Sequence, residues 1–191
     1  MGMGVYDEFL VRMCTCVLDC VRVNVYGLRM TNTRKAHRAG RQLVLIDIEN
    51  LIARSSPTCE EVGMAKDALR QVVADFDDAQ QIVACSHHAA PTVAFAFGNH
   101  ARHLWRSGPD GADLALLDVL EYERVDERFE RVTICSGDGI FTASAASLAT
   151  ADVEVTVISL PGHLSTRLRL AAQHLILLPP VASTAATESA S

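Results

Sequence analysis

The sequence is poor in aromatic residues, which make up only 5% of its 191 residues. Its hydrophobic fraction of 49% must therefore come mainly from valine, leucine, isoleucine and alanine, a composition that suits a core between helices and a sheet. Positive charge is also in deficit, because the formal net charge is -6. This balance disfavours broad electrostatic attraction to nucleic acid or anionic lipid, so a polyanionic substrate would need a local basic patch or metal ions.

Long apolar runs are absent as well. No uninterrupted stretch reaches the roughly 18 apolar residues that a transmembrane helix needs. Charged residues also interrupt the N-terminal region where a signal peptide would have its apolar segment. We therefore expect a cytoplasmic protein without a membrane partner, whose six cysteines are reduced thiols. The spacing of Cys14, Cys16 and Cys20 fits no common zinc pattern.

The chain divides into three parts by composition. Residues 1–40 combine a short strand-like alternation at Val21, Val23 and Val25 with a polar, basic stretch, and we interpret them as an extension outside the main fold. Residues 41–180 carry the regular patterns of one domain. Residues 181–191 are too small and polar to pack, so we expect a disordered tail.

Apolar strands and amphipathic helices alternate from Gln42 onward. We predict strands at residues 42–48, 81–85, 131–135, 153–159 and 174–178, with a short strand or irregular crossing at 101–105. Helices are predicted at residues 58–77, within 87–99, and at 110–124, 140–150 and 165–172. Thr58 and Glu61 form the pattern of a capping box at the start of the first helix. This alternation predicts an α/β fold, a three-layer α/β/α sandwich with a mostly parallel central sheet.

Acidic residues follow the ends of these predicted elements. Asp47 ends the apolar run of residues 43–46, which is typical of a buried parallel strand, and we expect this strand in the middle of the sheet. Asp138 lies between two glycines just after the strand at 131–135, and Asp113 lies near the start of the helix at 110–124. Because open α/β sheets place their ligands at the carboxyl ends of the strands, the three carboxylates could meet at one edge. The sequence therefore predicts a divalent metal site there.

Each polar residue has an alternative interpretation when it is taken alone. Asp113 could be a helix N-cap, Asp138 a turn residue, and Asn50 the cap of the next turn. Asp118 lies about 500° of helical rotation beyond Asp113, so the two share a pocket only if Asp113 lies in a first, non-helical turn. An isolated acid at Asp118 would more often face solvent or pair with an arginine. The joint occurrence of these residues at element ends favours the metal site.

Basic and aromatic residues gather between the second predicted strand and the helix that contains Asp113. Trp105 and Arg106 could stack on bases and contact phosphates, with Arg102 nearby. The alternative is that Trp105 anchors the core while the two arginines are solvated. We add Ser136 and Gly137, beside Asp138, to the predicted substrate-binding residues.

Three segments carry a resemblance to a known family. They are LVLIDIENL at residues 43–51, GPDGADLALLDVL at 108–120 and VTICSGDGIF at 132–141. In order and spacing they resemble the NYN domain family, a PIN-like nuclease fold, and in particular its actinobacterial type. The resemblance spans roughly residues 42–178 and implies a metal-dependent endoribonuclease, a hydrolase acting on RNA phosphodiester bonds.

The resemblance also implies roles for particular residues. Asp47, Asp113 and Asp138 match the family's metal-binding acids, with Mg2+ or Mn2+ as the implied cofactor. Asn50 and Asp118 match its supporting polar positions, and all five are expected in the catalytic site. The implied partner is RNA, while the oligomeric state, a homodimer included, stays open.

One position departs from the family pattern. Many relatives have a further aspartate two residues after the position of Asp138, where this chain has Ile140, which cannot bind a metal. This leaves open an alternative, a catalytically weak or inactive RNA-binding or regulatory protein of the same fold. A phosphatase or a nucleotide-binding protein ranks last, because the chain has no GxGxxG, GxxxxGK[ST] or DxDx[TV] motif.

Overall fold

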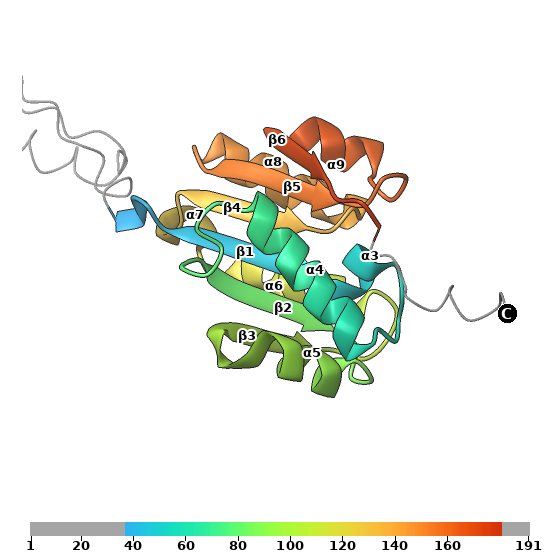
Figure 1. The fold of residues 1–191 in the computed structure, drawn as a ribbon. Coiled ribbons are helices and arrows are strands. Elements are labelled where there is room, and N and C mark those ends of the chain that lie inside the picture. The colour runs from blue at the N-terminus through green and yellow to red at the C-terminus, as the bar shows by residue number, and fades with distance from the viewer. Residues whose placement is uncertain (1–36, 181–191) are drawn as a thin grey trace, which may run out of the picture. The chain divides into compact units, whose positions relative to one another are not determined.

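A computed structural model describes residues 37–180 of the chain, so nearly all of the predicted extension and the predicted tail lie outside the described residues. Its centre is a sheet of six strands in the order β3-β2-β1-β4-β5-β6, and every pairing is parallel. The strands are β1 (Gln42–Asp47), β2 (Gln80–Cys85), β3 (Ala101–Trp105), β4 (Arg131–Cys135), β5 (Glu154–Ser159) and β6 (His174–Leu177). The predicted parallel sheet is confirmed (Figure 1).

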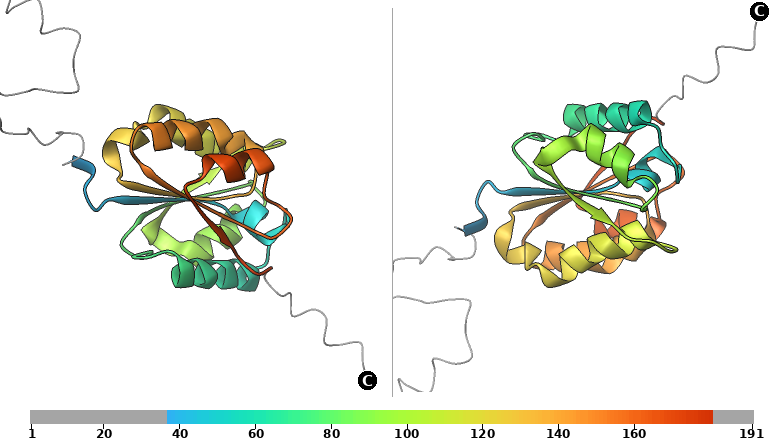
Figure 2. Two further views of the ribbon diagram at one scale, coloured as in Figure 1. Left: turned by 90° about the horizontal axis from the view of Figure 1, so that it is seen from above. Right: turned by 90° about the horizontal axis from the view of Figure 1, so that it is seen from below.

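Helices cover both faces of the sheet, which confirms the predicted three layers (Figure 2). One layer consists of α3 (Ile48–Ile52), α4 (Cys59–Val72) and α5 (Ala90–Phe97). The other consists of α6 (Gly111–Tyr122), α7 (Val125–Arg128), α8 (Thr142–Thr150) and α9 (Thr166–Ala171). Two short 3-10 turns, η1 (Gly98–His100) and η2 (Gly139–Phe141), precede β3 and α8. None of the helices between residues 37 and 180 combines the length and hydropathy that crossing a membrane requires.

Strand β1 lies in the middle of the sheet and is buried along its whole length. Its side chains alternate between the two layers: Val44 and Ile46 pack against α3–α5, and Leu43 and Leu45 against α6–α9. A strand that is apolar on both faces must have both faces covered, which explains why this run predicts a central position. Asp47 is therefore carried to the edge of the sheet from its most buried strand.

Several predicted boundaries differ from the structure by one or more residues, and two of them do so for identifiable reasons. The strand predicted to reach residue 48 ends at Asp47, because the side chain of Asp47 caps the short helix α3. The helix predicted to reach residue 77 ends at Val72, although Val73 and Phe76 beyond it are buried. Their apolar side chains continue the helical periodicity into a turn, where Asp75 adopts a positive φ of 54°.

Arg38 belongs to the folded unit, although we placed it in the extension. The folded unit begins at Arg38, which is only 4% exposed. Its guanidinium donates hydrogen bonds of 2.9 Å to the backbone carbonyls of Asp126, Ala151 and Asp152. Three carbonyl groups at the ends of α7 and α8 thereby gain a charged donor.

The predicted capping box at the start of α4 is confirmed. The Thr58 hydroxyl accepts a hydrogen bond from the Glu61 N–H at 3.2 Å, and the Glu61 carboxylate accepts one from the Thr58 N–H at 2.8 Å. Arg54 donates a further bond to Glu61 at 2.5 Å. The Thr58 N–H above all, with help from Arg54, holds the pKa of Glu61 below its ordinary value.

This pKa shift makes part of the stability dependent on pH. Because the folded-state pKa is lowered, ionised Glu61 stabilises the fold above its ordinary pKa of 4.5, and that contribution is lost as the pH falls through the lowered value. We expect Glu61→Gln to reduce the free energy of unfolding by about 1 kcal/mol at pH 7 and by much less at pH 3. Urea unfolding at both values measures the difference. Glu60→Gln, an exposed change in the same turn, is the control, and an equal effect of the two variants would contradict the account.

Candidate metal centre

The acidic residues lie near the place where the segments after two neighbouring strands go to opposite faces of the sheet. After β1 it continues into α3 and α4 on one face, and after β4 into η2 and α8 on the other. Because β1 and β4 are neighbours, their following segments diverge and leave a crevice at the carboxyl ends of the two strands. Asp47 ends β1 and Ser136 follows β4, so both border this crevice.

Asp47 is 3% exposed, and hydrogen bonds fix its carboxylate. Its Oδ1 accepts the N–H of Asn50 at 3.2 Å, which makes Asp47 the N-cap of α3. Its Oδ2 faces the hydroxyl of Ser136 at 3.4 Å, a long contact across the two strands. The expected position of Asp47 at the end of the central strand is confirmed.

Asp113 enters the same region from the opposite layer. It is the third residue of α6, inside the helix, whereas Asp110 occupies the N-cap position, so the N-cap interpretation of Asp113 was wrong. Asp113 is 8% exposed, and its Oδ1 is buried with no hydrogen-bond donor facing it. Gly111 makes this placement possible, because a Cβ there would collide with the backbone carbonyl of Arg106.

The carboxyl groups of Asp47 and Asp113 lie within hydrogen-bonding reach of each other. Burial raises the pKa of Asp47 well above its ordinary value, and the charge of Asp113 raises it further. Burial also raises the pKa of Asp113, with a contribution from the charge of Asp138, against the lowering effect of the contact with Asp47. Two buried like charges resist joint ionisation, so this pair favours a proton or a cation between its members.

Asp138 stands beside this pair without closing it into a three-acid group. Its Oδ1 accepts the N–H of Ile140 at 2.9 Å, so it caps η2, and its side chain is half-buried. Over residues 37–180, no three Asp, Glu, His or Cys side chains are grouped closely enough to hold one metal ion together. The sequence predicts three converging carboxylates. The structure instead has a close pair, Asp47 and Asp113, with the charge of Asp138 nearby.

Asn50, Ser136 and Gly137 connect the segments that follow β1 and β4. The side-chain oxygen of Asn50 accepts the Gly137 N–H at 2.9 Å, and the Ser136 hydroxyl accepts the Asp138 N–H at 3.2 Å. Ser136 and Gly137 are buried, and a Cβ at Gly137 would collide with the backbone carbonyl of His163. In this structure these residues hold the loop in place, whereas we expected Ser136 and Gly137 to contact substrate.

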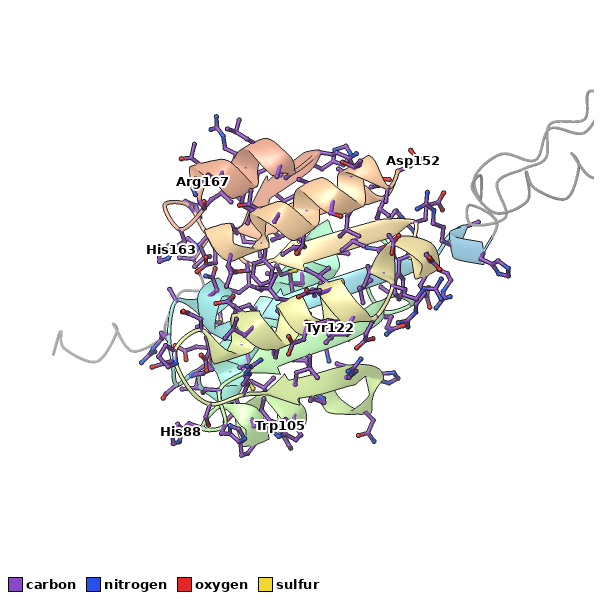
Figure 3. The ribbon with its side chains drawn as sticks, turned by 180° about the vertical axis from the view of Figure 1, so that it is seen from behind. His88, Trp105, Tyr122, Asp152, His163 and Arg167 are labelled. Atoms are coloured by element: carbon purple, nitrogen blue, oxygen red, sulfur yellow. The ribbon has the colours of Figure 1, made fainter. Side chains whose placement is uncertain are left out.

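The remaining predicted site residues lie on the surface near β3. Asp118 is exposed and pairs with Arg106 at 3.1 Å, and Arg102 pairs with Glu123 at 2.6 Å. Because Asp113 lies within the helix, the spacing of five residues places Asp118 on a different side of α6 from Asp113. Trp105 is 51% exposed on the edge strand, so it is not a core anchor (Figure 3).

Sequence reasoning missed a second connection between strand ends. Glu49 is half-buried, and its Oε1 accepts the N–H of Ser86, just after β2, at 3.0 Å. The hydroxyl of Ser86 is buried without a partner among the described residues. The sequence shows an acid, Glu49, two positions after Asp47. It does not show the partner of this acid, because only the pairing of β1 with β2 brings Ser86 close to Glu49.

A hollow of about 540 Å³ opens at the opposite edge of the sheet. Its lining comes from the amino ends of β1, β2 and β4 and includes Gln42, Gln80 and Arg131. Cavity size alone would therefore direct attention away from the acids. The chemistry of the acids defines the candidate site instead, because a divalent metal ion needs converging oxygen ligands and can bind at an open edge.

Comparison with known proteins supports the fold and goes no further. A crystal structure of a protein of unknown function from Vibrio parahaemolyticus is similar, with a TM-score of 0.51 and 15% sequence identity, over 74% of this chain and 94% of that chain. No protein-family profile matches the chain, and no curated protein matches it. The resemblance to the NYN family stays a prediction.

The buried carboxylate pair should weaken the metal-free protein. In Asp47→Asn the side chain can still cap α3, while its amide can donate to the unpartnered oxygen of Asp113. We expect this variant to be more stable than the wild type by about 1–3 kcal/mol at pH 7 in EDTA, measured by urea unfolding. Asp118→Asn, which removes an exposed charge, serves as the control. Lower stability of Asp47→Asn would show that the pair does not destabilise the fold.

Proposed function

We propose that this protein is a metal-dependent endoribonuclease that hydrolyses RNA phosphodiester bonds, with Mg2+ or Mn2+ bound at Asp47 and Asp113. The observation that carries the proposal is the buried, unpartnered Oδ1 of Asp113 beside the buried carboxylate of Asp47. Burying two like charges side by side costs free energy, and so does leaving the Asp113 oxygen without a donor. A small divalent cation would compensate both charges at once.

The residues present fit such an ion. Mg2+ takes hard oxygen ligands, and one or two carboxylates are enough when water and a substrate phosphate complete its shell. Asp47 and Asp113 supply the two carboxylates, and Asp138 adds a third negative charge nearby. When bound, the ion would lower the pKa of a water molecule and offset charge on the phosphodiester.

The chain's own groups would hold the reacting parts in place. The Asn50 N–H and the Ser136 hydroxyl orient the carboxylate of Asp47. Asp138 uses Oδ1 to cap η2, which leaves its other oxygen to accept a hydrogen bond from the attacking water. Asn50 acts through its bond to Gly137, so its role is to position this loop.

RNA is the proposed substrate because of the sequence resemblance, and the charge of the protein agrees with a need for metal. The three segments around Asp47, Asp113 and Asp138 resemble the NYN family in order and spacing. The net charge of -6 and the acidic crevice would repel a polyanion unless a cation intervenes, which agrees with a requirement for metal. The position of the acids at the crevice between β1 and β4 is the usual ligand site of an open α/β sheet.

Ile140 favours a second candidate, an RNA-binding protein that does not cut. Its side chain packs against the apolar cluster of the α6–α9 layer, where the family pattern has a further acid. A chain that lacks this carboxylate would bind RNA and release no products. Ile140→Asp restores the acid, so a gain of cleavage in this variant alone would favour the second candidate.

Cleavage assays on single-stranded RNA test the proposal directly. With Mg2+ or Mn2+ we expect products from the wild-type protein and at least a hundredfold lower rate from Asp47→Asn and from Asp113→Asn, since each removes a metal ligand. Asp118→Asn changes the same charge on the same helix as Asp113→Asn and should keep its rate within about threefold. Activity that persists in the double variant Asp47→Asn/Asp138→Asn would refute the enzymatic role.

A further inference from the structure

Helix α9 carries a positive charge at the same edge of the sheet as the acids. Arg167 in this helix and His163 in the loop before it are both exposed. Figure 3 shows the two residues at the same end of the molecule. Between residues 37 and 180, no acidic side chain pairs with Arg167, so its charge is available to a ligand.

The loop before α9 is attached directly to the loop that carries Asp138. The Ser165 N–H donates to the Gly137 carbonyl at 2.8 Å. A Cβ at Gly139 would lie 2.8 Å from the Ser165 hydroxyl, and one at Gly137 would collide with the carbonyl of His163. Arg167 follows Ser165 by two residues, so it starts from backbone that is packed against the acidic site.

Arginines elsewhere around the crevice are already paired. Arg102 binds Glu123 and Arg106 binds Asp118 on the β3 side. Arg54, after α3, binds Glu61. The Arg106–Asp118 and Arg54–Glu61 pairs have no net charge and offer a phosphate little attraction, while Arg102 and Arg128 share the carboxylate of Glu123. The unpaired cation next to the acids is therefore on the α9 side.

We infer that Arg167, with His163 beside it, forms a phosphate-binding subsite for the RNA strand that leaves the Asp47–Asp113 pair. This rests on the proposed function, because the subsite would hold the phosphate that flanks the one being cleaved. An arginine suits this task, since its planar guanidinium donates two parallel hydrogen bonds to phosphate oxygens. The substrate would then run along α9 and not across the Trp105 surface.

Arg169 provides a matched control within the same helix. It is exposed, and none of the described acids pairs with it. It lies two positions after Arg167, about 200° around the helix, and the buried Leu168 separates the two. Both variants therefore lose one unpaired charge from α9, on different sides of the helix, and Arg167 is the one that follows the loop before α9 more closely in the chain.

The test measures binding without cleavage. Fluorescence anisotropy of a labelled single-stranded oligouridylate, with Ca2+ in place of Mg2+, gives Kd for the full chain between about 50 and 200 mM KCl. We expect Arg167→Ala to weaken binding roughly fivefold and to reduce the slope of log K against log salt by about 0.7, the value for one phosphate contact on a single strand. Arg167→Lys should retain most of the affinity, and Arg169→Ala should stay within about twofold.

Two negative results have different meanings. If the wild-type protein binds the RNA and cleaves it with Mn2+, while Arg167→Ala and Arg169→Ala bind equally well or are weakened equally, the subsite is overturned and the proposed function stands. If the wild-type protein does not bind RNA with Ca2+ or cleave it with Mn2+, the proposed function fails and the subsite with it. Weakening by Arg106→Ala alone would place the strand on the β3 side and overturn the inference.

Discussion

Two carboxyl groups, those of Asp47 and Asp113, are held close together at the buried end of the central strand. Like charges in such surroundings repel each other and lose hydration, so the fold must hold them in place. It does so from two directions. Strand β1 carries Asp47 out of a core that is apolar on both faces, and α6 carries Asp113 in from the opposite layer, past the close approach at Gly111. A cation bound between the carboxylates would relieve this repulsion, and the relief would contribute to the free energy of binding.

Hydrogen bonds between separate segments keep the arrangement rigid. Asn50 ties α3 to the loop after β4, and Glu49 ties α3 to the end of β2. The loop after β4 is in turn braced by Ser165, and Gly137 leaves no room for a side chain. Carboxylates that cannot separate are suited to bind a small ion, because little reorganisation is needed when it arrives. The same bracing holds the loop before α9 against the loop that carries Asp138.

Much of this fold could be predicted from the sequence, because periodicity and strand ends are local signals. The central position of β1 followed from its continuous apolar run, and the start of α4 followed from its capping box. The partners of the site residues could not be predicted, since they depend on contacts between distant segments. The bond from Asn50 to Gly137 and the pairing of Arg106 with Asp118 are examples. Neither leaves a pattern in the local sequence.

The central claim is that the Asp47–Asp113 pair is a site for a divalent cation. Anomalous diffraction from crystals soaked in Mn2+ tests it most directly. At the X-ray absorption edge of manganese the metal scatters anomalously, while the light atoms of the protein contribute little. The account predicts a peak between these two carboxylates, with Asp138 adjacent, and no such peak in Asp47→Asn crystals. Crystals that show manganese only elsewhere, or none at saturating concentration, would contradict it.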